Sequence, residues 1–335
     1  MQNELDYGSA IREGFQYLLK NHPEVFVIGQ GVWAPWYVGN SMTNLDVEFG
    51  KDRVIDTPVS EEACTGMAVG ASLCGYKPIV IHPRMDFMIL AMDPIVNQAA
   101  KWSYMLGGAN NPSCTFRSII NRGGEQGAQH SQALHSWFAH IPGLRVVMPS
   151  TVQDARDLLI AATLCKDPVL YIDDRWLYER TEKLNPVNVT NLDLNTMGPK
   201  VTRDGKDITL VGAGYTTYQC ELAAEELLKV NISAEVIDLR VINPLDISNV
   251  IQSVKKTGNL IVVDGGWRNC GLASEIVAGV TEIGGLKIFK NSPLRMTLPE
   301  VPAPSSHILE KAYYLKTNDI VEATIKMIQT HVMVC

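Results

Sequence analysis

The amino-acid sequence predicts an α/β protein with two domains, each a mostly parallel sheet flanked by helices. Apolar strand-like runs alternate with helix-patterned segments over residues 1–174. The pattern fades in a polar stretch interrupted by proline and glycine, and then resumes. Such alternation is typical of parallel sheets covered by helices. We expect a first domain over residues 1–185, a linker over 186–204 and a second domain over 205–335.

The first domain opens with an amphipathic helix over residues 8–20, where Ile11, Phe15, Leu18 and Leu19 share one face. Ser150 and Gln153 have the spacing of a capping box for a helix over 151–164. Further helices are expected at 60–75, 93–106 and 133–140. Strands are expected at 24–29, 53–58, 78–82, 114–120, 145–150 and 168–173.

In the second domain, strands are expected at 208–214, 234–239 and 260–266, with helices at 217–229 and 246–255. The turn after the first of these strands carries Gly212-x-Gly214, and Asp238 ends the next strand. This context partly matches a dinucleotide-binding fingerprint, but Thr217 stands where the third glycine belongs. Glycines in a tight strand-to-helix turn also have a purely steric explanation, so both interpretations stay open.

Composition narrows the class of protein. Of the 335 residues, 46% are hydrophobic and 19% are charged, which is typical of a globular enzyme. The net charge of −7 argues against nucleic acid and anionic membranes as partners, and no run is apolar enough to span a bilayer. The seven cysteines are scattered without a Cys-x-x-Cys pair. We expect reduced thiols and a cytoplasmic protein, with neither disulfides nor a metal site.

A pair of glutamates, Glu61 and Glu62, begins the small-residue helix in "TPVSEEACTGMAVGASL". Acidic residues in a first turn are favoured by the helix dipole, and Ser60 is placed to cap the helix. A carboxylate at the start of a helix that is packed closely on several faces also suits a functional role. The local sequence does not decide between these two interpretations.

Two further stretches carry candidate site residues. His130, His135 and His140 recur every five residues, which is a poor spacing for metal ligands on one helix. His130 follows a glycine-bearing loop, where α/β proteins place working residues, whereas the other two suit packing or surface roles. The segment "HPRMDF", residues 82–87, lies past a strand end and offers His82 and Arg84 for substrate contact. The alternative is an ordinary loop with an ion pair between Arg84 and Asp86.

Several segments together resemble one family. They are "RVIDTPVSE", "TGMAVGASLCGYKPIV", "DPIVNQAAKW", "AQHSQALHSWFAHIPGLRVVMPS", "VIDLRVINPLD" and "VVDGGWRNCG". In order and spacing they are similar to the beta subunit of thiamine-diphosphate-dependent 2-oxo acid dehydrogenases of the pyruvate, acetoin and branched-chain type. The resemblance covers nearly the whole chain. It implies a thiamine-diphosphate pyrimidine-binding fold followed by a transketolase C-terminal-like domain.

The resemblance implies roles for four residues. Glu61 matches the glutamate that contacts the cofactor's aminopyrimidine ring, Phe87 the aromatic residue stacked on that ring, and Val59 an aliphatic position beside it. His130 matches the active-site histidine. A carboxyl group that is hydrogen-bonded to the pyrimidine nitrogen in a water-poor site promotes the imino tautomer of the cofactor. The cofactor is activated through this tautomer. His130 would donate to the developing oxygen of the substrate or move a proton.

The resemblance also implies a partner. In this superfamily a Gly-Asp-Gly segment and a later Asn hold the diphosphate and its Mg²⁺, and no Gly-Asp-Gly occurs here. We expect an alpha-type subunit to supply that half, most simply in an α2β2 heterotetramer with the site between chains. A lipoyl acyltransferase is a further expected partner. The small-residue helix, with Gly66 and Gly70, suits close packing at the junction.

The family default is decarboxylation of a pyruvate-like 2-oxo acid, followed by transfer of the acyl group to lipoamide. The chain departs from the family around "HPRMD" and "SIINRGGEQ", where Arg84, Arg122 and Glu125 are candidates to reshape the substrate pocket. Arginine suits carboxylate or phosphate recognition. A transketolase-like carboligase acting on an aldehyde, ketone or sugar is therefore the alternative. A non-catalytic scaffold subunit and a nicotinamide-binding enzyme are alternatives of other classes.

Overall fold

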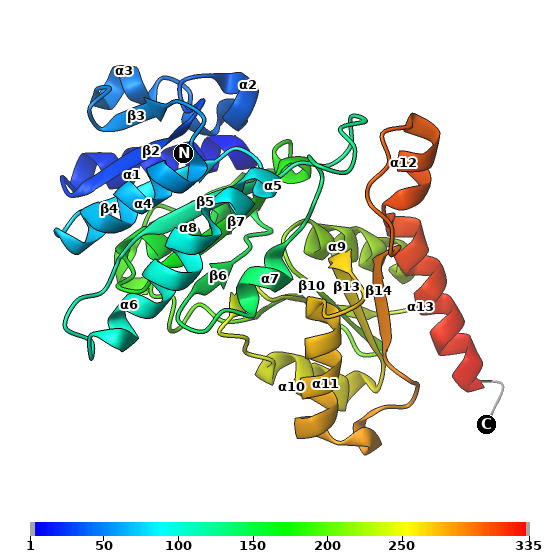
Figure 1. Ribbon diagram of the computed structural model, residues 1–335. Coiled ribbons are helices and arrows are strands. Elements are labelled where there is room, and N and C mark those ends of the chain that lie inside the picture. Colours follow the sequence, from blue (N-terminus) through cyan, green and yellow to red (C-terminus); the bar gives the residue numbers. More distant parts are fainter. Residues whose placement is uncertain (1–3, 333–335) are drawn as a thin grey trace. The chain divides into compact units, whose positions relative to one another are not determined.

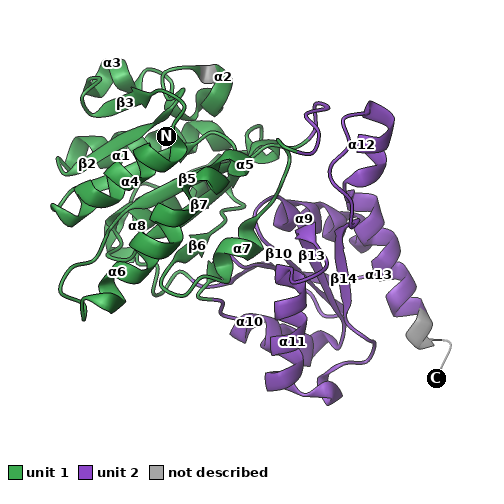
Figure 2. Ribbon diagram, viewed as in Figure 1, with its two compact units in different colours: residues 1–122, 129–197, 241–244 green, residues 123–128, 198–240, 245–335 purple. Residues whose placement is uncertain are grey.

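The computed structural model describes residues 4–332 and confirms the predicted α/β class with two domains. Unit 1 comprises residues 1–122, 129–197 and 241–244. Unit 2 comprises residues 123–128, 198–240 and 245–335 (Figure 2). Each unit thus takes a short segment from the sequence of the other. No helix of the described chain is both long and apolar enough to cross a membrane.

Unit 1 is built on a seven-stranded sheet with the order β12-β6-β7-β5-β4-β2-β3 (Figure 1). All neighbours are parallel except β12, which runs antiparallel to β6. The strands are β2 (Val25–Gln30), β3 (Val54–Thr57), β4 (Lys77–His82), β5 (Thr115–Ile120), β6 (Arg145–Val147), β7 (Val169–Asp174) and β12 (Val241–Asn243). A separate two-stranded ribbon pairs β1 (Glu4–Asp6) with β8 (Thr181–Lys183).

Three longer helices cover this sheet. α1 (Tyr7–Asn21) lies beside α8 (Val152–Leu164), and α4 (Glu61–Leu73) packs against β4 (Figure 1). The remaining helices of unit 1 are short. They are α2 (Pro35–Val38), α3 (Leu45–Phe49), α5 (Met85–Met88), α6 (Ala100–Met105) and α7 (His135–Ala139), with turns η1 (Gly39–Met42), η2 (Ile89–Ala91), η4 (Arg175–Leu177) and η5 (Val189–Asn191).

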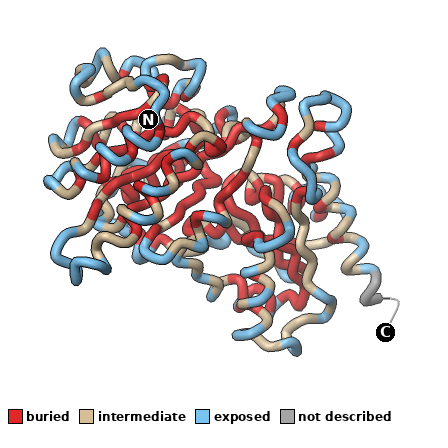
Figure 3. Tube along the Cα trace, viewed as in Figure 1, coloured by how far each residue is buried: buried red, intermediate tan, exposed pale blue. Residues whose placement is uncertain are grey.

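The central strands are buried along their whole length, as Figure 3 shows for both units. All six residues of β5 and all six of β7 are buried, including the polar side chains that interrupt their apolar sequences. Gly29 on β2 allows a close approach to β4, because an added Cβ would lie 2.4 Å from the Ile81 carbonyl oxygen. Since these strands are parallel, their carboxyl ends meet at one edge of the sheet, where the following loops gather.

Some local expectations are wrong. The predicted capping box of Ser150 and Gln153 does not form: Thr151 caps α8, and its hydroxyl accepts from the Asp154 amide at 3.0 Å. The side chain of Gln153 instead donates a hydrogen bond to the Asp157 carboxylate and accepts one from the backbone amide of Asn185. The predicted helix over 93–106 is confirmed, although its first part, η3 (Asp93–Ala99), is π-helical and only the second part, α6, is α-helical.

Charged side chains lie buried inside unit 1. The guanidinium of Arg117 donates to both carboxylate oxygens of Asp173, at 3.0 and 2.8 Å, and both side chains are inaccessible to solvent. Tyr178 also donates to Asp173, at 2.6 Å. Arg122 pairs with Asp174 at 2.6 Å in the same way. A buried charge needs a partner with good geometry, so these contacts stabilise the adjoining strands β5 and β7 in one arrangement.

Unit 2 has a five-stranded sheet with the order β14-β13-β10-β11-β9, in which only β9 is antiparallel to its neighbour. Its strands are β9 (Lys200–Arg203), β10 (Ile208–Gly212), β11 (Ala234–Asp238), β13 (Leu260–Trp267) and β14 (Leu294–Leu298). Its helices are α9 (Tyr215–Leu228), α10 (Ser248–Thr257), α11 (Leu272–Gly284), α12 (His307–Tyr313) and α13 (Thr317–Val332), with the turn η6 (Leu286–Ile288).

Residues 123–128 belong to unit 2 through contacts with α12. The backbone amide of Glu125 donates to the carboxylate of Glu310 at 3.1 Å, and its own carboxylate pairs with His307 at 3.2 Å. Glu125 adopts a positive φ of 60°. A segment that interrupts the sequence of the first sheet is therefore anchored to the last third of the chain.

Candidate active site

Glu61 lies at the carboxyl edge of the unit 1 sheet, where it begins α4. The residue is only 8% exposed. Its carboxylate forms no hydrogen bond or ion pair with any residue in 4–332, so it faces a pocket rather than a protein partner. That pocket is lined by Gly29, Gln30, Thr57, Pro58, Ser60, Glu61, Cys64, Val80, Ile81, His82 and Pro83. Residues from three parallel strand ends thus surround one buried carboxylate.

The interpretation of this helix start as a simple cap loses its main support. Ser60 stands at the N-cap position, but its side chain makes no capping hydrogen bond. Gln30, which lines the same pocket, has a buried amide oxygen with no partner among the described residues. Buried polar atoms are normally paired, and exceptions are frequent at binding sites. Glu61 and Gln30 therefore give the pocket an acceptor-rich wall that suits a ligand with N–H donors.

Phe87 and His130, predicted separately, lie in contact. Phe87 belongs to α5, just after β4, and His130 to the loop before α7. Their rings meet edge to face with centroids 5.3 Å apart and an interplanar angle of 82°. Both residues are half-buried. Val59 is 69% exposed at the end of the β3–α4 loop, which leaves its side chain free to contact a ligand or partner.

Asp86 holds the His130 loop in place, a role that the sequence did not suggest. One carboxylate oxygen accepts from the Gln132 backbone amide at 3.2 Å and from its side chain at 2.9 Å. The other oxygen is buried and has no partner among the described residues. Burial raises the pKa of the Asp86 carboxyl, and the bonds from Gln132 oppose that rise. Asp86 is therefore a positioning group between Phe87 and His130.

His82 and Arg84 differ in what they can do. His82 is buried, with Nε2 3.4 Å from the Thr65 hydroxyl, and burial lowers its pKa to about 4. It is neutral at physiological pH. The alternative of an Arg84–Asp86 ion pair is wrong, because within the described chain Arg84 makes no ion pair or side-chain hydrogen bond and Asp86 binds Gln132. Arg84 is half-buried.

The other two histidines of the series, His135 and His140, differ in their exposure to solvent. His135 begins α7 and is buried, whereas His140 is exposed at the end of that helix. The helix itself spans fewer residues than the predicted 133–140. Among the described residues, no three His, Cys, Asp or Glu side chains gather in an arrangement that holds a metal ion.

The glycine turn of unit 2 is explained by steric packing. A Cβ on Gly212 would lie 2.5 Å from the Thr217 amide nitrogen, so the strand-to-helix turn itself demands glycine. Asp238 is fully buried and accepts a hydrogen bond from the Thr217 hydroxyl at 3.2 Å. In a dinucleotide site Asp238 would have to bind the ribose, but here its carboxylate is buried and hydrogen-bonded to Thr217.

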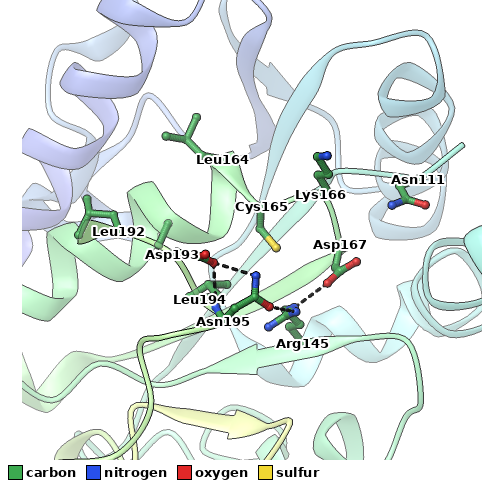
Figure 4. A pocket seen from close by; sticks show the side chains of 11 residues that line it. Asn111, Arg145, Leu164, Cys165, Lys166, Asp167, Leu192, Asp193, Leu194 and Asn195 are labelled. Atoms are coloured by element: carbon green, nitrogen blue, oxygen red, sulfur yellow. Dashed lines mark hydrogen bonds and ion pairs between the residues drawn. The ribbon is translucent and has the colours of Figure 1, made fainter. Parts of the chain in front are cut away.

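A larger pocket, of about 480 Å³, lies at the opposite edge of the unit 1 sheet, near the amino ends of β6 and β7 (Figure 4). Arg145 reaches across it, paired with Asp167 at 2.7 Å and with the Asn195 amide oxygen at 2.7 Å. The guanidinium of Arg145 therefore already has protein partners. In open α/β sheets ligands bind beyond the carboxyl ends of the strands, so the smaller pocket at Glu61 is the better candidate.

Sequence reasoning missed Gln30, Asn121 and Arg175 near the strand ends. Asn121 is buried after β5 and bonds the Pro83 carbonyl at 3.1 Å, while Arg175 follows β7 and bonds Asn121 at 3.3 Å. Each is a polar residue directly after or at the end of a buried strand. That position was the available signal, and it had pointed only to residues 82–87 and His130.

Comparison with known proteins assigns both units. Residues 3–180 match the family described as "Transketolase, pyrimidine binding domain", and residues 199–320 match "Transketolase, C-terminal domain". The split gene transketolase in an inactive beta4 tetramer shares the fold with a TM-score of 0.73 at 19% identity, covering 97% of this chain and 98% of that one.

Sequence relatives are closer. The mitochondrial pyruvate dehydrogenase E1 component subunit beta of Dictyostelium discoideum is 36% identical over 97% of this chain and 92% of its own length. The acetoin:2,6-dichlorophenolindophenol oxidoreductase subunit beta of Cupriavidus necator is 35% identical over 97% of this chain and 98% of its own length. The chain therefore belongs to the beta subunits of the thiamine-diphosphate-dependent 2-oxo acid dehydrogenases.

Proposed function

We propose that this beta-type subunit takes part in decarboxylating a pyruvate-like 2-oxo acid and transferring the acyl group, by default to lipoamide. The observation that carries the proposal is the Glu61 carboxylate, 8% exposed and without a protein partner in a pocket at the carboxyl edge of the sheet. A carboxylate that is nearly buried and has no protein partner is free to hydrogen-bond a ligand. A ligand that hydrogen-bonds to it would account for the arrangement.

The pocket, of about 10 Å³, does not enclose a pyrimidine ring by itself, so Phe87 and Val59, which lie outside its lining, would complete the site for the pyrimidine half of thiamine diphosphate. Glu61 would share a proton with a ring nitrogen, Phe87 would offer an apolar face to the ring, and Val59 would contact its edge. When bound, the cofactor supplies a nucleophilic carbon and an electron sink for decarboxylation. The buried oxygen of Gln30 is a further acceptor on the same wall.

His130 would serve the substrate rather than the cofactor. Its ring is fixed by the edge-to-face contact with Phe87, and its loop is fixed by the bonds from Gln132 to Asp86. A histidine held in this way can donate to the developing oxygen of a carbonyl substrate or move a proton during acyl transfer. The proposed catalytic residues are thus Glu61 and His130.

We further propose an alpha-type subunit that carries the Gly-Asp-Gly segment and holds the diphosphate and Mg²⁺, in an α2β2 assembly. Helix α4 offers a surface for it. Gly66 and Gly70 are exposed, an added Cβ at either would meet nothing within 4 Å, and Met67 between them is 59% exposed. A partner helix can approach such a surface closely. A lipoyl acyltransferase and a cytoplasmic location, where thiols stay reduced, complete the proposal.

A carboligase remains the second candidate because of Arg84. A half-buried arginine without a carboxylate partner lies at the exit of β4, three residues before Phe87. This residue suits an acceptor that carries a carboxylate or phosphate. Transfer to an aldehyde, ketone or sugar would then replace transfer to lipoamide.

The test begins with native purification of the tagged chain and mass spectrometry of its stoichiometric partners. The holoenzyme is then assayed with pyruvate plus thiamine diphosphate and Mg²⁺, with lipoamide or with aldehyde acceptors. A partner that carries Gly-Asp-Gly, together with reductive acylation of lipoamide, supports the proposal. Carbon–carbon bond formation without lipoamide acylation supports the carboligase. A chain that purifies alone and shows no turnover contradicts both and favours a scaffold.

A further inference from the structure

Two arginines lie at the carboxyl edge of the unit 1 sheet without carboxylate partners. Arg84 follows β4, and Arg175 follows β7. Arg175 donates to the Asn121 amide oxygen at 3.3 Å and to the Tyr37 carbonyl oxygen at 2.8 Å. Asn121 in turn donates to the carbonyl of Pro83, the residue before Arg84, at 3.1 Å. A chain of hydrogen bonds therefore fixes Arg175 relative to the start of the Arg84 segment.

Arg84 is the member of the pair whose side chain has no protein partner among the described residues. Within residues 4–332 its side chain makes no hydrogen bond or ion pair, although it is half-buried. Burial lowers the pKa of Arg84, the nearby positive charge of Arg175 lowers it further, and the negative charge of Asp86 opposes that fall. Arg122, by contrast, is paired with Asp174 at 2.6 Å and is not available for a ligand. Of the three arginines near the strand ends, Arg122 is held by a carboxylate, Arg175 by neutral groups, and Arg84 by no side-chain contact among the described residues.

Two like charges in a partly desolvated position repel each other, and a bound anion would relieve that repulsion. Arg84 is adjacent to Pro83, which lines the Glu61 pocket, and its carbonyl accepts from the Phe87 amide at 3.2 Å. Arg84 is therefore close in the chain to residues proposed to hold the cofactor and the reacting carbonyl group. Perturbed charged groups in such a position are typical of functional sites.

We propose that Arg84, supported by Arg175, binds an anionic group on the part of the substrate that is retained after decarboxylation. This inference rests on the proposed function. An ion pair to the carboxylate that leaves as CO₂ would stabilise the ground state more than the transition state and would slow the reaction. The charge recognised is instead a second carboxylate on the 2-oxo acid or a phosphate on the acceptor.

The test uses the holoenzyme and two matched substrate pairs. 2-Oxoglutarate is compared with 2-oxopentanoate as donor, and glyceraldehyde 3-phosphate with glyceraldehyde as acceptor. Within at least one pair the wild type should favour the anionic member by at least about tenfold in kcat/KM. Arg84→Met should reduce kcat/KM for that member by about 10- to 100-fold and change the neutral member by less than about threefold. Arg84→Lys should restore part of the preference.

A donor preference assigns a dicarboxylic 2-oxo acid, and an acceptor preference assigns a phosphorylated acceptor. The control is Arg12→Met, which removes a partly exposed arginine paired with Glu48 at 3.3 Å and should leave both preferences unchanged. The inference is overturned if Arg84→Met loses kcat/KM equally for the anionic and neutral members, or if the wild type shows no preference. Turnover of a 2-oxo acid in that experiment would still support the proposed function.

If no 2-oxo acid is turned over, the proposed function fails, and the arginine site is tested by binding alone. Inorganic phosphate is titrated into the purified complex, or into the full chain if it purifies alone, while Tm is followed. Phosphate that raises Tm in the wild type but not in Arg84→Met supports an anion site. Equal shifts in both proteins overturn it.

Discussion

The Phe87 ring meets the His130 ring edge to face, with centroids 5.3 Å apart at 82°. One residue follows the strand β4 and the other precedes α7, so the fold brings two distant segments of the chain into one site. The contact links the face proposed to hold the cofactor to the group proposed to serve the substrate. A change in one residue is therefore expected to affect the other.

Phe87→Leu should weaken cofactor use without unfolding the chain. Leucine keeps an apolar side chain but loses the flat face and the contact with His130, which is worth about 0.5–1.5 kcal/mol. The thiamine diphosphate concentration for half-maximal activity should rise by roughly 2- to 12-fold. Phe26→Leu is the matched control, because Phe26 makes the same kind of contact with Tyr76, at 5.9 Å and 80°. A similar rise in the control would contradict a specific role for Phe87.

Glu61→Gln should abolish turnover while the complex still assembles. The amide keeps the size of the side chain but cannot share a proton with a ring nitrogen, and a loss of at least about 100-fold in kcat is expected. Glu62→Gln is the control, since Glu62 is the neighbouring but exposed residue of the same helix. Size-exclusion chromatography checks assembly. An unchanged kcat in Glu61→Gln removes the carboxylate from the mechanism.

Gly66→Leu should separate folding from assembly. No atom lies within 4 Å of an added Cβ at this position, and leucine has a higher helix propensity than glycine. The Tm of the isolated chain should stay the same or rise, whereas affinity for the alpha-type partner should fall by about tenfold or more if this face is the junction. Lys20→Leu on the exposed end of α1 serves as control. Undiminished assembly of Gly66→Leu would place the junction elsewhere.

His82 should make the stability of the chain depend on pH. Its folded pKa of about 4 lies below its ordinary value of 6.5, because burial disfavours the charged ring. Between these values the unfolded state binds more protons, so stability is present above pH 6.5 and is lost as the pH falls toward 4. The full effect is about 3 kcal/mol.

His82→Gln keeps a hydrogen-bonding group for Thr65 but has no charge to gain in acid. Urea unfolding of the wild type and this variant at several pH values measures the difference. The free energy of unfolding should fall more steeply with decreasing pH in the wild type. Parallel curves for the two proteins would show that His82 is protonated in the folded state as easily as in the unfolded one.

The sequence predicted the elements whose pattern is local and strong. The helix expected over 8–20 is α1, and the buried strands expected near 114–120 and 168–173 are β5 and β7, because long apolar runs bury both faces of a parallel strand. Thr151 was missed as a cap because Ser150 offered the same chemistry one residue earlier. Neighbouring hydroxyl residues are not distinguished by spacing alone.

Side-chain pairs between neighbouring strands could not be predicted from the sequence. Arg117 was read as part of an apolar strand, yet its partner Asp173 lies on an adjacent strand far along the chain. Likewise, the sequence placed Asp86 beside Arg84, whereas the structure gives Asp86 to Gln132. Such contacts depend on strand order and register, which a single sequence does not state. The roles of Glu61 and Phe87 came from family resemblance and stay predictions.

The anchoring of residues 123–128 to α12 limits how the gene can be divided. A single break after residue 197 would leave Glu125 on one polypeptide and its contacts His307 and Glu310 on the other. Residues 241–244, whose strand β12 completes the seven-stranded sheet, would be separated from that sheet by the same break. Neither fragment would contain all of its own unit, so a break at this position is expected to destabilise both units.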